Sequence, residues 1–362
     1  MRHRLAPAPA LTATLLALAC SAADSSAPPA PTVSTARAPS GAGAAGGAGC
    51  AFERSRRTMR LVADCTTDRT IRVDDGFTLD GGGHTITVVD PAGDHFRGAV
   101  VENAGASASV RDLRIVAQGL ANVCDDGDDR LAGIRLTDAA GVVADNVVIG
   151  LVQLAPDGQV SGCQEGWSIW ARTRAWDGIP VKVSITGNHI EGYQKEGILA
   201  FGAVAATIAS NDVRGGGAQH VQAQYGIEVT TSLPGAVRRN QVTGNVYLGP
   251  FAVYAGGINS DRSRRLTISG NVVTASSAGI QLFDADDADV IGNTVTGPSP
   301  ASCPAWSPSA PCSFGVQISG SGQLRANEFR SLDVGVDVLP GSARVKISGN
   351  RNQDVGTPVR RQ

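Results

Sequence analysis

The sequence is poor in aromatic residues and lysine, and it lacks helical periodicity. Aromatic residues make up 4% of its 362 residues, and lysine occurs only as Lys182, Lys195 and Lys346. The formal net charge is -2 and no basic tract occurs, so nothing indicates a nucleic acid partner. No window keeps a 3.6-residue apolar period, which predicts almost no helix beyond the N-terminal segment.

Common catalytic motifs are also missing. The chain contains neither the HExxH spacing of zinc proteases nor the GxSxG motif of serine hydrolases. Glycine, in contrast, occurs 45 times, and short runs rich in Val, Ile and Thr recur along the chain. These runs favour strands, so we expect an all-β protein.

The N-terminus has the layout of a secretory signal peptide over residues 1–19. Two arginines precede an apolar run, 11–19, that is too short to span a bilayer. The run ends at Cys20 and resembles the lipobox of bacterial lipoproteins, in which Cys20 would be lipidated, although Ala17 stands where that motif usually has Leu. The alternative is cleavage near Ala19 or Ala23 and release of the protein.

Residues 20–49 are rich in Ala, Pro, Ser and Gly and offer almost nothing to bury, which predicts a flexible linker. We therefore expect one folded domain over residues 50–362. Seven cysteines are present, and six remain once Cys20 is set aside. In an exported protein they predict disulfides between sequence neighbours, namely Cys50 with Cys65, Cys124 with Cys163, and Cys303 with Cys312.

Two markers recur along the chain. An Asn, often preceded by Gly, follows a short apolar run at Asn146, Asn188, Asn211, Asn240, Asn271, Asn293, Asn327 and Asn350. A Gly followed by an apolar residue occurs after most of them, as in Gly197-Ile198 and Gly226-Ile227. The shortest Asn spacing, from Asn271 to Asn293, is 22 residues, and the longer spacings place insertions in one part of the repeat.

This pattern is typical of a β-solenoid, in which each turn buries its apolar face only by stacking on its neighbours. An Asn at the same bend of every coil can hydrogen-bond the coils above and below. We therefore interpret the recurring Asn residues as a structural ladder and not as catalytic groups.

Here the chain resembles the right-handed parallel β-helix proteins of the pectate-lyase-like superfamily, of the secreted bacterial type. The segment Thr78–Ile86, TLDGGGHTI, is similar to the first full coil of many secreted members, and Cys50 and Cys65 match their upstream pair. The resemblance implies a parallel β-helix of about 9 to 11 coils. It does not specify an activity, because this fold carries lyases, hydrolases, esterases, epimerases and members without a known reaction. The His and Asp pairs of the polygalacturonases do not appear in recognisable order.

The repeat register predicts three strands per coil, for example 183–186, 189–192 and 197–201. Insertions collect between the second and third strands, which places Cys124 and Cys163 in the same turn of adjacent coils. Outward side chains of the third strand should form columns. Two positions after the Gly, we align Arg135, Ser168, Leu199, Glu228, Asn259, Gln281, Gln317 and Asp337. Four positions after it, we align Thr137, Trp170, Phe201, Thr230, Asp261, Phe283, Ser319 and Leu339.

This face mixes aromatic rings with amides and acids, which suits a sugar chain. The candidate substrate-binding residues are Arg135, Trp170, Phe201, Tyr225, Asn259, Gln281 and Phe283. The alternative is that the rings only pack beneath the long loops.

Lys195, Glu196 and Glu228 are the catalytic candidates. Lys195 could accept the proton in a β-elimination from a uronate or pair with the substrate carboxylate, and Glu196 and Glu228 could act as acid and base in hydrolysis. The alternative for Lys195 is a surface salt bridge to Glu196 or Glu165.

The segment CDDGDD packs four carboxylates into six residues next to the loop that carries Glu165. Asp125, Asp126, Asp128, Asp129 and Glu165 are thus candidate ligands for Ca²⁺, with a solvated acidic turn as the alternative. Together, the sequence predicts an exported, lipid-anchored monomer that binds a polysaccharide of the extracellular space or cell envelope. Lyase chemistry or plain binding is favoured over hydrolysis. The rival is a non-catalytic module that displays its loops for protein contacts.

Overall fold

The computed structural model describes residues 49–298, 303–309, 311–342 and 344–362, which belong to one compact unit, Gly46–Gln362. Within these ranges the only helical segment is a 3-10 turn, η1 (Gly127–Asp129), and no helix could cross a membrane. The predicted signal peptide, the lipidation site Cys20 and all of the predicted linker except Gly49 lie outside the described residues.

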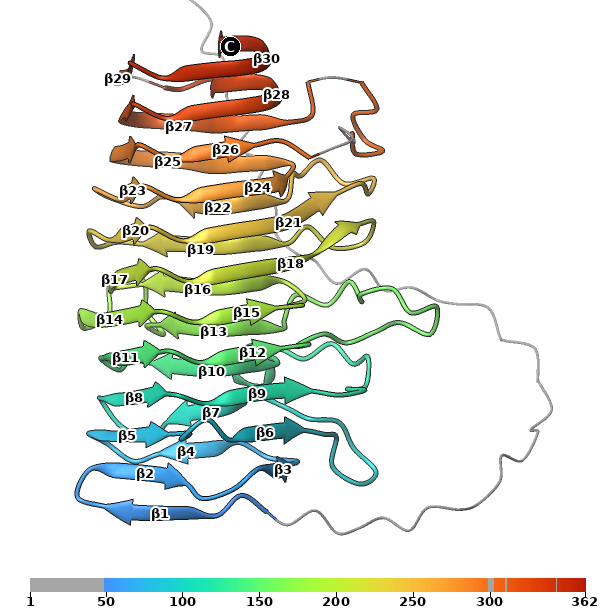
Figure 1. The fold of residues 1–362 in the computed structure, drawn as a ribbon, viewed down its shortest axis with the longest axis vertical. Coiled ribbons are helices and arrows are strands. Elements are labelled where there is room, and N and C mark those ends of the chain that lie inside the picture. Colours follow the sequence, from blue (N-terminus) through green and yellow to red (C-terminus); the bar gives the residue numbers. More distant parts are fainter. Residues whose placement is uncertain (1–48, 299–302, 310, 343) are drawn as a thin grey trace, which may run out of the picture. The chain divides into compact units, whose positions relative to one another are not determined.

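The chain winds through three parallel sheets, which we call A, B and C in the order in which each coil visits them (Figure 1). Sheet A holds β2 (Thr58–Leu61), β5 (Phe77–Asp80), β8 (Ala108–Arg111), β11 (Gly141–Ala144), β14 (Val181–Thr186), β17 (Val204–Ala209), β20 (Ala236–Arg238), β23 (Thr267–Ser269) and β29 (Arg344–Ser348). Sheet B holds β3 (Cys65–Thr67), β6 (Thr85–Val88), β9 (Arg114–Ala117), β12 (Val147–Ile149), β15 (His189–Glu191), β18 (Asp212–Gln219), β21 (Gln241–Tyr247), β24 (Val272–Ser276) and β26 (Thr294–Thr296).

Sheet C holds β4 (Ile71–Val73), β7 (Ala99–Asn103), β10 (Ala132–Thr137), β13 (Trp167–Arg172), β16 (Glu196–Gly202), β19 (Tyr225–Thr231) and β22 (Gly256–Asp261). Four long strands bend from one sheet into the next: β25 (Ala278–Ile291) and β27 (Phe314–Arg325) run from C into A, and β28 (Glu328–Val338) and β30 (Arg351–Arg361) run from B into C. Only β1 (Phe52–Ser55) pairs antiparallel among the described strands, with β2. The prediction of an all-β parallel helix is therefore confirmed.

Stacked aliphatic side chains fill the interior. In sheet C, for example, Ile134, Ile169, Ile198, Ile227, Ile258 and Ile280 lie in register and are at most 1% exposed. Burying such side chains away from water supplies most of the stabilisation of a solenoid.

The predicted Asn ladder is present at the bend between sheets A and B. Each Asn side chain from Asn146 to Asn327 donates to the Oδ1 of the Asn in the next coil at 2.9–3.0 Å, and the ladder ends at Asn350. The residue before each of these Asn residues has a positive φ, which is why Gly so often stands there.

The second sequence marker has a packing cause. A Cβ on Gly197 would lie 2.6 Å from the carbonyl oxygen of Gly226 in the next coil, and one on Gly226 would lie 2.6 Å from that of Gly257. No larger residue fits at these positions without moving the backbone. The glycines therefore set the close contact between coils at the start of sheet C.

All three predicted disulfides are present, and each joins Cα atoms that are 5.1 Å apart. They are Cys50–Cys65, Cys124–Cys163 and Cys303–Cys312. Disulfides are typical of proteins that fold in an oxidising compartment outside the cytoplasm.

Candidate functional site

The outward side chains of sheet C form one continuous column, which we call the stripe. In register from the first coil to the last it contains Arg72, Glu102, Arg135, Trp170, Leu199, Glu228, Asn259, Gln281, Gln317, Asp337 and Arg360. Successive side chains are separated by one coil, about 4.8 Å. The predicted column is therefore confirmed at every position except one.

The exception lies in the coil that begins at Trp167. The sequence alignment put Ser168 in the stripe and Trp170 in the next column, but Trp170 pairs with both Arg135 and Leu199, and Arg172 lies beside Phe201. In this coil Ser168 takes the place that Gly occupies in the neighbouring coils. With Gly166 as the marker of this coil, the predicted assignment of its residues to columns is wrong by two positions.

The tryptophans of this coil are packed into the protein. The rings of Trp167 and Trp170 lie 4.2 Å apart, both are about 5% exposed, and Leu199 and Phe201 pack against them. The Arg172 guanidinium lies 4.1 Å from the centroid of the Trp170 ring. Trp170 is thus a buried part of the stripe, whereas Phe201 and Phe283 are half-buried.

Glu196 and Glu228 come together at the centre of the stripe. Glu196 is 4% exposed and Glu228 is half-buried on the next coil. Burial raises the pKa of the Glu196 carboxyl well above its ordinary value, and the nearby charge of Glu228 raises it further, while the charge of Lys195 lowers it. Glu196 is therefore suited to hold a proton.

Lys195 and Tyr225 lie beside this acid pair. Lys195 Nζ donates to the Ala223 carbonyl at 3.2 Å and sits 4.9 Å from the centroid of the Tyr225 ring. No carboxylate of the described residues lies within 4.0 Å of Lys195 Nζ, so the alternative of a salt bridge to Glu196 or Glu165 is not seen. Burial, together with Glu228 and Glu196, raises the pKa of Tyr225.

Three successive amides, Asn259, Gln281 and Gln317, follow Glu228 in the stripe. Gln281 Nε2 donates to Gln317 Oε1 at 3.0 Å, and Gln317 Nε2 donates to Asp337 at 3.3 Å. Asn259 and Gln281 are 6% and 2% exposed. Beyond these amides the stripe ends in a charged pair, Asp337 and Arg360, whose side chains lie 2.8 Å apart.

Buried polar atoms without a hydrogen-bond partner concentrate on this face. They include Arg135 Nε, Trp167 Nε1, Trp170 Nε1, Glu196 Oε2, Asn259 Oδ1 and Gln281 Oε1. Nearly all buried polar atoms of folded proteins have a partner, in the protein or in bound water or ligand. A cluster of exceptions on one face is therefore a functional signal.

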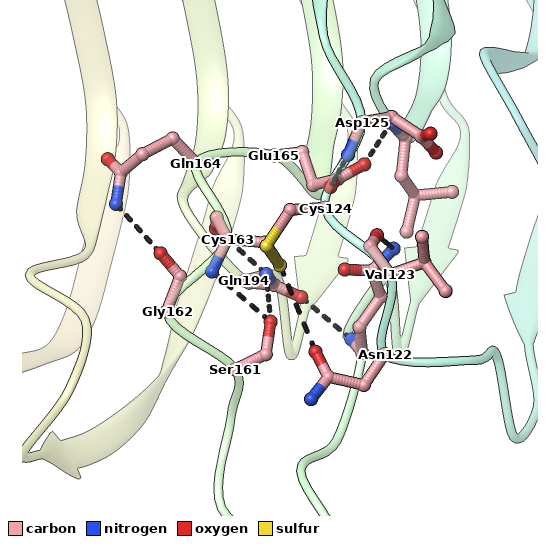
Figure 2. The surroundings of a disulfide bond; sticks show 12 residues. Asn122, Val123, Cys124, Asp125, Ser161, Gly162, Cys163, Gln164, Glu165 and Gln194 are labelled. Carbon is pink, nitrogen blue, oxygen red and sulfur yellow. Dashed lines mark hydrogen bonds between the residues drawn. A yellow bond between two sulfur atoms is a disulfide. The ribbon is translucent and has the colours of Figure 1, made fainter. Parts of the chain in front are cut away.

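The acidic loop does not gather its carboxylates around one point. Glu165 is fully buried and accepts hydrogen bonds from the backbone N–H groups of Asp125 (3.0 Å) and Leu131 (2.7 Å), next to the Cys124–Cys163 disulfide (Figure 2). Burial raises the pKa of Glu165, while these two hydrogen bonds oppose that change. Glu165 therefore holds both ends of the segment from Asp125 to Leu131 in place.

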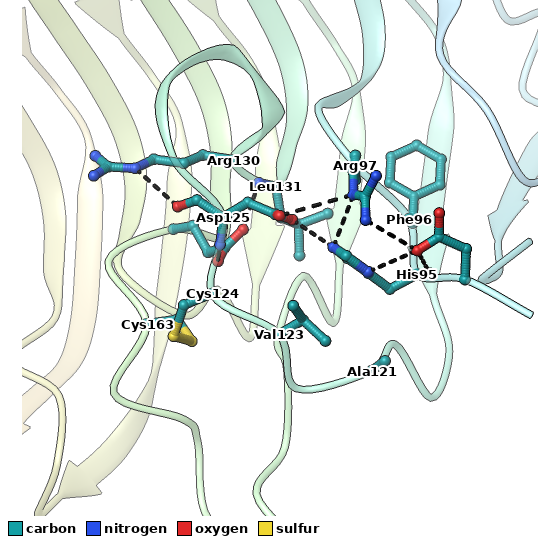
Figure 3. Close-up of polar contacts among 12 residues, drawn as sticks. His95, Phe96, Arg97, Ala121, Val123, Cys124, Asp125, Arg130, Leu131 and Cys163 are labelled. Carbon is teal, nitrogen blue, oxygen red and sulfur yellow. Dashed lines mark hydrogen bonds and ion pairs between the residues drawn. A yellow bond between two sulfur atoms is a disulfide. The ribbon is translucent and has the colours of Figure 1, made fainter. Parts of the chain in front are cut away.

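The other carboxylates of the loop have separate partners. Asp125 lies 2.8 Å from His95 Nε2 (Figure 3), Asp126 pairs with Arg130, and Asp128 contacts Arg172 and Arg174. Asp129 is exposed. The described residues contain no group of three or more His, Cys, Asp or Glu side chains that could hold a metal ion.

Sequence reasoning missed Trp176 and His95. Trp176 lies in the turn between β13 and β14, is half-buried, and contacts Phe201 edge-on at 5.9 Å. His95 bridges Asp94 and Asp125. A search for aromatic residues in every turn would have found Trp176, but no pattern in the sequence links His95 to Asp125, which is 30 residues away.

The family model described as a right-handed β-helix region matches residues 171–352, half of the chain. The protein therefore belongs to the right-handed β-helix family. No curated protein matches it.

Similar solved structures share the fold at low sequence identity. The A-module of the mannuronan C-5 epimerase AlgE4 of Azotobacter vinelandii is 11% identical, with 84% of this chain and 86% of that one covered and a TM-score of 0.50. The Dettilon tailspike protein is 16% identical, with 82% of this chain covered and a TM-score of 0.48. This chain spans 61% of the tailspike's length.

Proposed function

We propose that this protein is exported and binds a polysaccharide of the extracellular space or cell envelope along the outer face of sheet C. The observation that carries the proposal is the line of buried, unpartnered polar atoms on that face, which includes both donors and acceptors. Sugar hydroxyls donate and accept, so a polysaccharide chain lying along the stripe would supply both kinds of partner. The half-buried rings of Phe201 and Tyr225 offer apolar surface beside it.

Export rests on the predicted signal peptide and is in keeping with the three disulfides. Lipidation at Cys20 would hold the domain at the membrane through the 20–49 linker, and we propose that the domain acts there as a monomer. The A. vinelandii module is named for mannuronan, which is also a polysaccharide.

The acid pair supports a proton-transfer reaction, for which we propose β-elimination at a uronate. Glu228 would take the proton next to the uronate carboxylate, and that C–H electron pair would form the new C=C bond. The C–O bond to the leaving sugar would break as Glu196 donates its proton to the oxygen. The proton on Glu228 would then pass to Glu196 on the adjacent coil, which restores both groups, and Lys195 would pair with the uronate carboxylate.

The test compares the full-length wild type with Glu196→Gln and Lys195→Ala on a panel of uronate polymers, with release of unsaturated product followed by ultraviolet absorbance. We expect Glu196→Gln to lower the rate by about 10²–10⁴-fold, and Lys195→Ala, which removes the partner of the uronate carboxylate, to lower product formation while the rest of the stripe still binds the polymer. The matched control is Glu191→Gln, which changes an exposed carboxylate of the same coil in sheet B. A wild type that forms no unsaturated product from any of these polymers would end the lyase proposal, and a glycan array without a binder would end the polysaccharide proposal.

The rival function is a non-catalytic module that presents its loops to other proteins. The packing of Trp167 and Trp170 favours it, because buried rings offer no free face to a sugar. It predicts that the glycan array finds no binder.

A further inference from the structure

A cavity of about 510 Å³ lies at the N-terminal end of the stripe. Its volume falls within the roughly 300–1,000 Å³ range of small-molecule sites. Arg135, in its lining, is separated from Glu228 by three coil steps along the stripe, about 14 Å at the ~4.8 Å coil spacing. The cavity is thus distinct from the acid pair but within reach of the same short oligosaccharide.

Charge is balanced in this cavity. Its lining holds the guanidinium groups of four arginines and the carboxylates of one Glu and three Asp, so the formal charges cancel. Arg72, Glu102 and Arg135 lie on three successive coils: Arg135 Nη2 donates to Glu102 at 3.1 Å, and Arg72 lies 3.7 Å from the other Glu102 oxygen. Arg174 similarly pairs with Asp138 at 2.9 Å.

Arg135 is the buried centre of this arrangement. It is 3% exposed, donates through Nη1 to the Asp128 carbonyl at 2.6 Å, and keeps Nε without a partner. These bonds use two of the five N–H donors of the guanidinium, so donors remain for a ligand. Arg72 makes no hydrogen bond among the described residues and has a side chain that is 69% exposed, so its donors are free as well.

The acidic loop forms one wall of the cavity and is held in place. Both Asp128 and Asp129 line the cavity, and Glu165 accepts the N–H groups of Asp125 and Leu131 on either side of them. The Cys124–Cys163 disulfide and the Asp125–His95 contact fix the loop at the same end (Figures 2 and 3). The wall is therefore preorganised, which lowers the entropic cost of binding.

We propose that this cavity is a subsite for an uncharged, hydroxyl-rich sugar unit of the bound polysaccharide. The inference rests on the proposed function and adds the class of sugar taken at this end of the stripe. A charge-balanced lining gives a uronate no net attraction and would set its carboxylate against Glu102 and Asp128. A hydroxyl group, in contrast, accepts from a guanidinium and donates to a carboxylate.

The test is titration calorimetry of the full chain with neutral hexasaccharides of glucose, mannose, galactose and xylose, and with hexamannuronate and hexagalacturonate. We expect at least one neutral hexasaccharide to bind and Arg72→Gln to weaken it about tenfold, the effect of one lost charged hydrogen bond. Raising NaCl from about 50 to 500 mM should change its Kd by less than about twofold, because no net charge is neutralised. Arg111→Gln is the control: this exposed arginine pairs with Asp80 on sheet A, away from the stripe.

Three results would overturn the inference. If only uronate oligomers bind, or if binding of a neutral sugar is unchanged by Arg72→Gln, the cavity is not a neutral-sugar subsite, while the proposed function stands. If no oligosaccharide of either kind binds, the proposed function falls and the inference falls with it.

Discussion

Two lines of polar side chains run along this β-helix, the Asn ladder from Asn146 to Asn350 and the stripe from Arg72 to Arg360, and they differ in composition and in hydrogen bonding. The ladder repeats Asn in successive coils, and each side chain from Asn146 to Asn327 is buried and hydrogen-bonded to its neighbours. The stripe changes residue at almost every coil, and several of its buried polar atoms have no partner. A structural element repeats one residue whose polar atoms are all hydrogen-bonded within the protein. A binding surface varies its residues and keeps polar atoms that a ligand can hydrogen-bond.

The comparison is sharpest for two buried asparagines, Asn211 in the ladder and Asn259 in the stripe. We expect Asn211→Ala to lower the free energy of unfolding by roughly 3 kcal/mol, because it leaves the Asn188 backbone N–H and the Ile185 carbonyl buried without partners. The measurement is chemical denaturation followed by circular dichroism.

Asn259→Ala is the matched control. Its Oδ1 accepts no hydrogen bond, so the substitution should cost less than about 1 kcal/mol. Equal losses from the two variants would remove the distinction between ladder and stripe.

The ladder could be predicted from the sequence because its physical cause is local and repeated. Gly or another residue of positive φ before Asn marks the bend, and a Gly with no room for a Cβ marks the start of sheet C. The same marker failed where Ser168 replaced Gly, and there the predicted column was displaced by two residues.

The site could be predicted only in part. Register alone brought Glu196 and Glu228 to adjacent coils, since both follow the repeat. The pairing of His95 with Asp125, and of Glu165 with two backbone N–H groups, depends on how two insertions fold against each other, and insertions follow no repeat.

A second difference is that a buried ionisable residue, Glu196, lies beside the stripe next to Glu228, whereas the ladder contains no ionisable residue. Because the pKa of Glu196 is raised on folding, its contribution to stability is fully present below the unfolded value of about 4.5 and is lost as the pH rises toward the folded pKa. Glu196→Gln cannot ionise, so we expect a higher Tm than the wild type at pH 7 and a gap that closes below pH 4.5. Thermal melts from below pH 4.5 to pH 7 measure the difference in Tm between the two proteins. A difference that does not change with pH would contradict a raised pKa of Glu196.

The smallest expected effect concerns calcium at the acidic loop, which borders the stripe. Its carboxylates are divided among Arg130, Arg172, His95 and backbone N–H groups, so a Ca²⁺ ion would have to displace several of these partners before it gained oxygen ligands. Millimolar Ca²⁺ should therefore change the Tm by less than about 1 °C, since a ligand stabilises only in proportion to its affinity for the folded state. The opposite result would be a saturable rise in Tm that Asp128→Asn abolishes. It would mean that the loop rearranges to gather its carboxylates around the ion. Asp128, in the wall of the neutral-sugar subsite, would then bind a cation instead of Arg172 and Arg174.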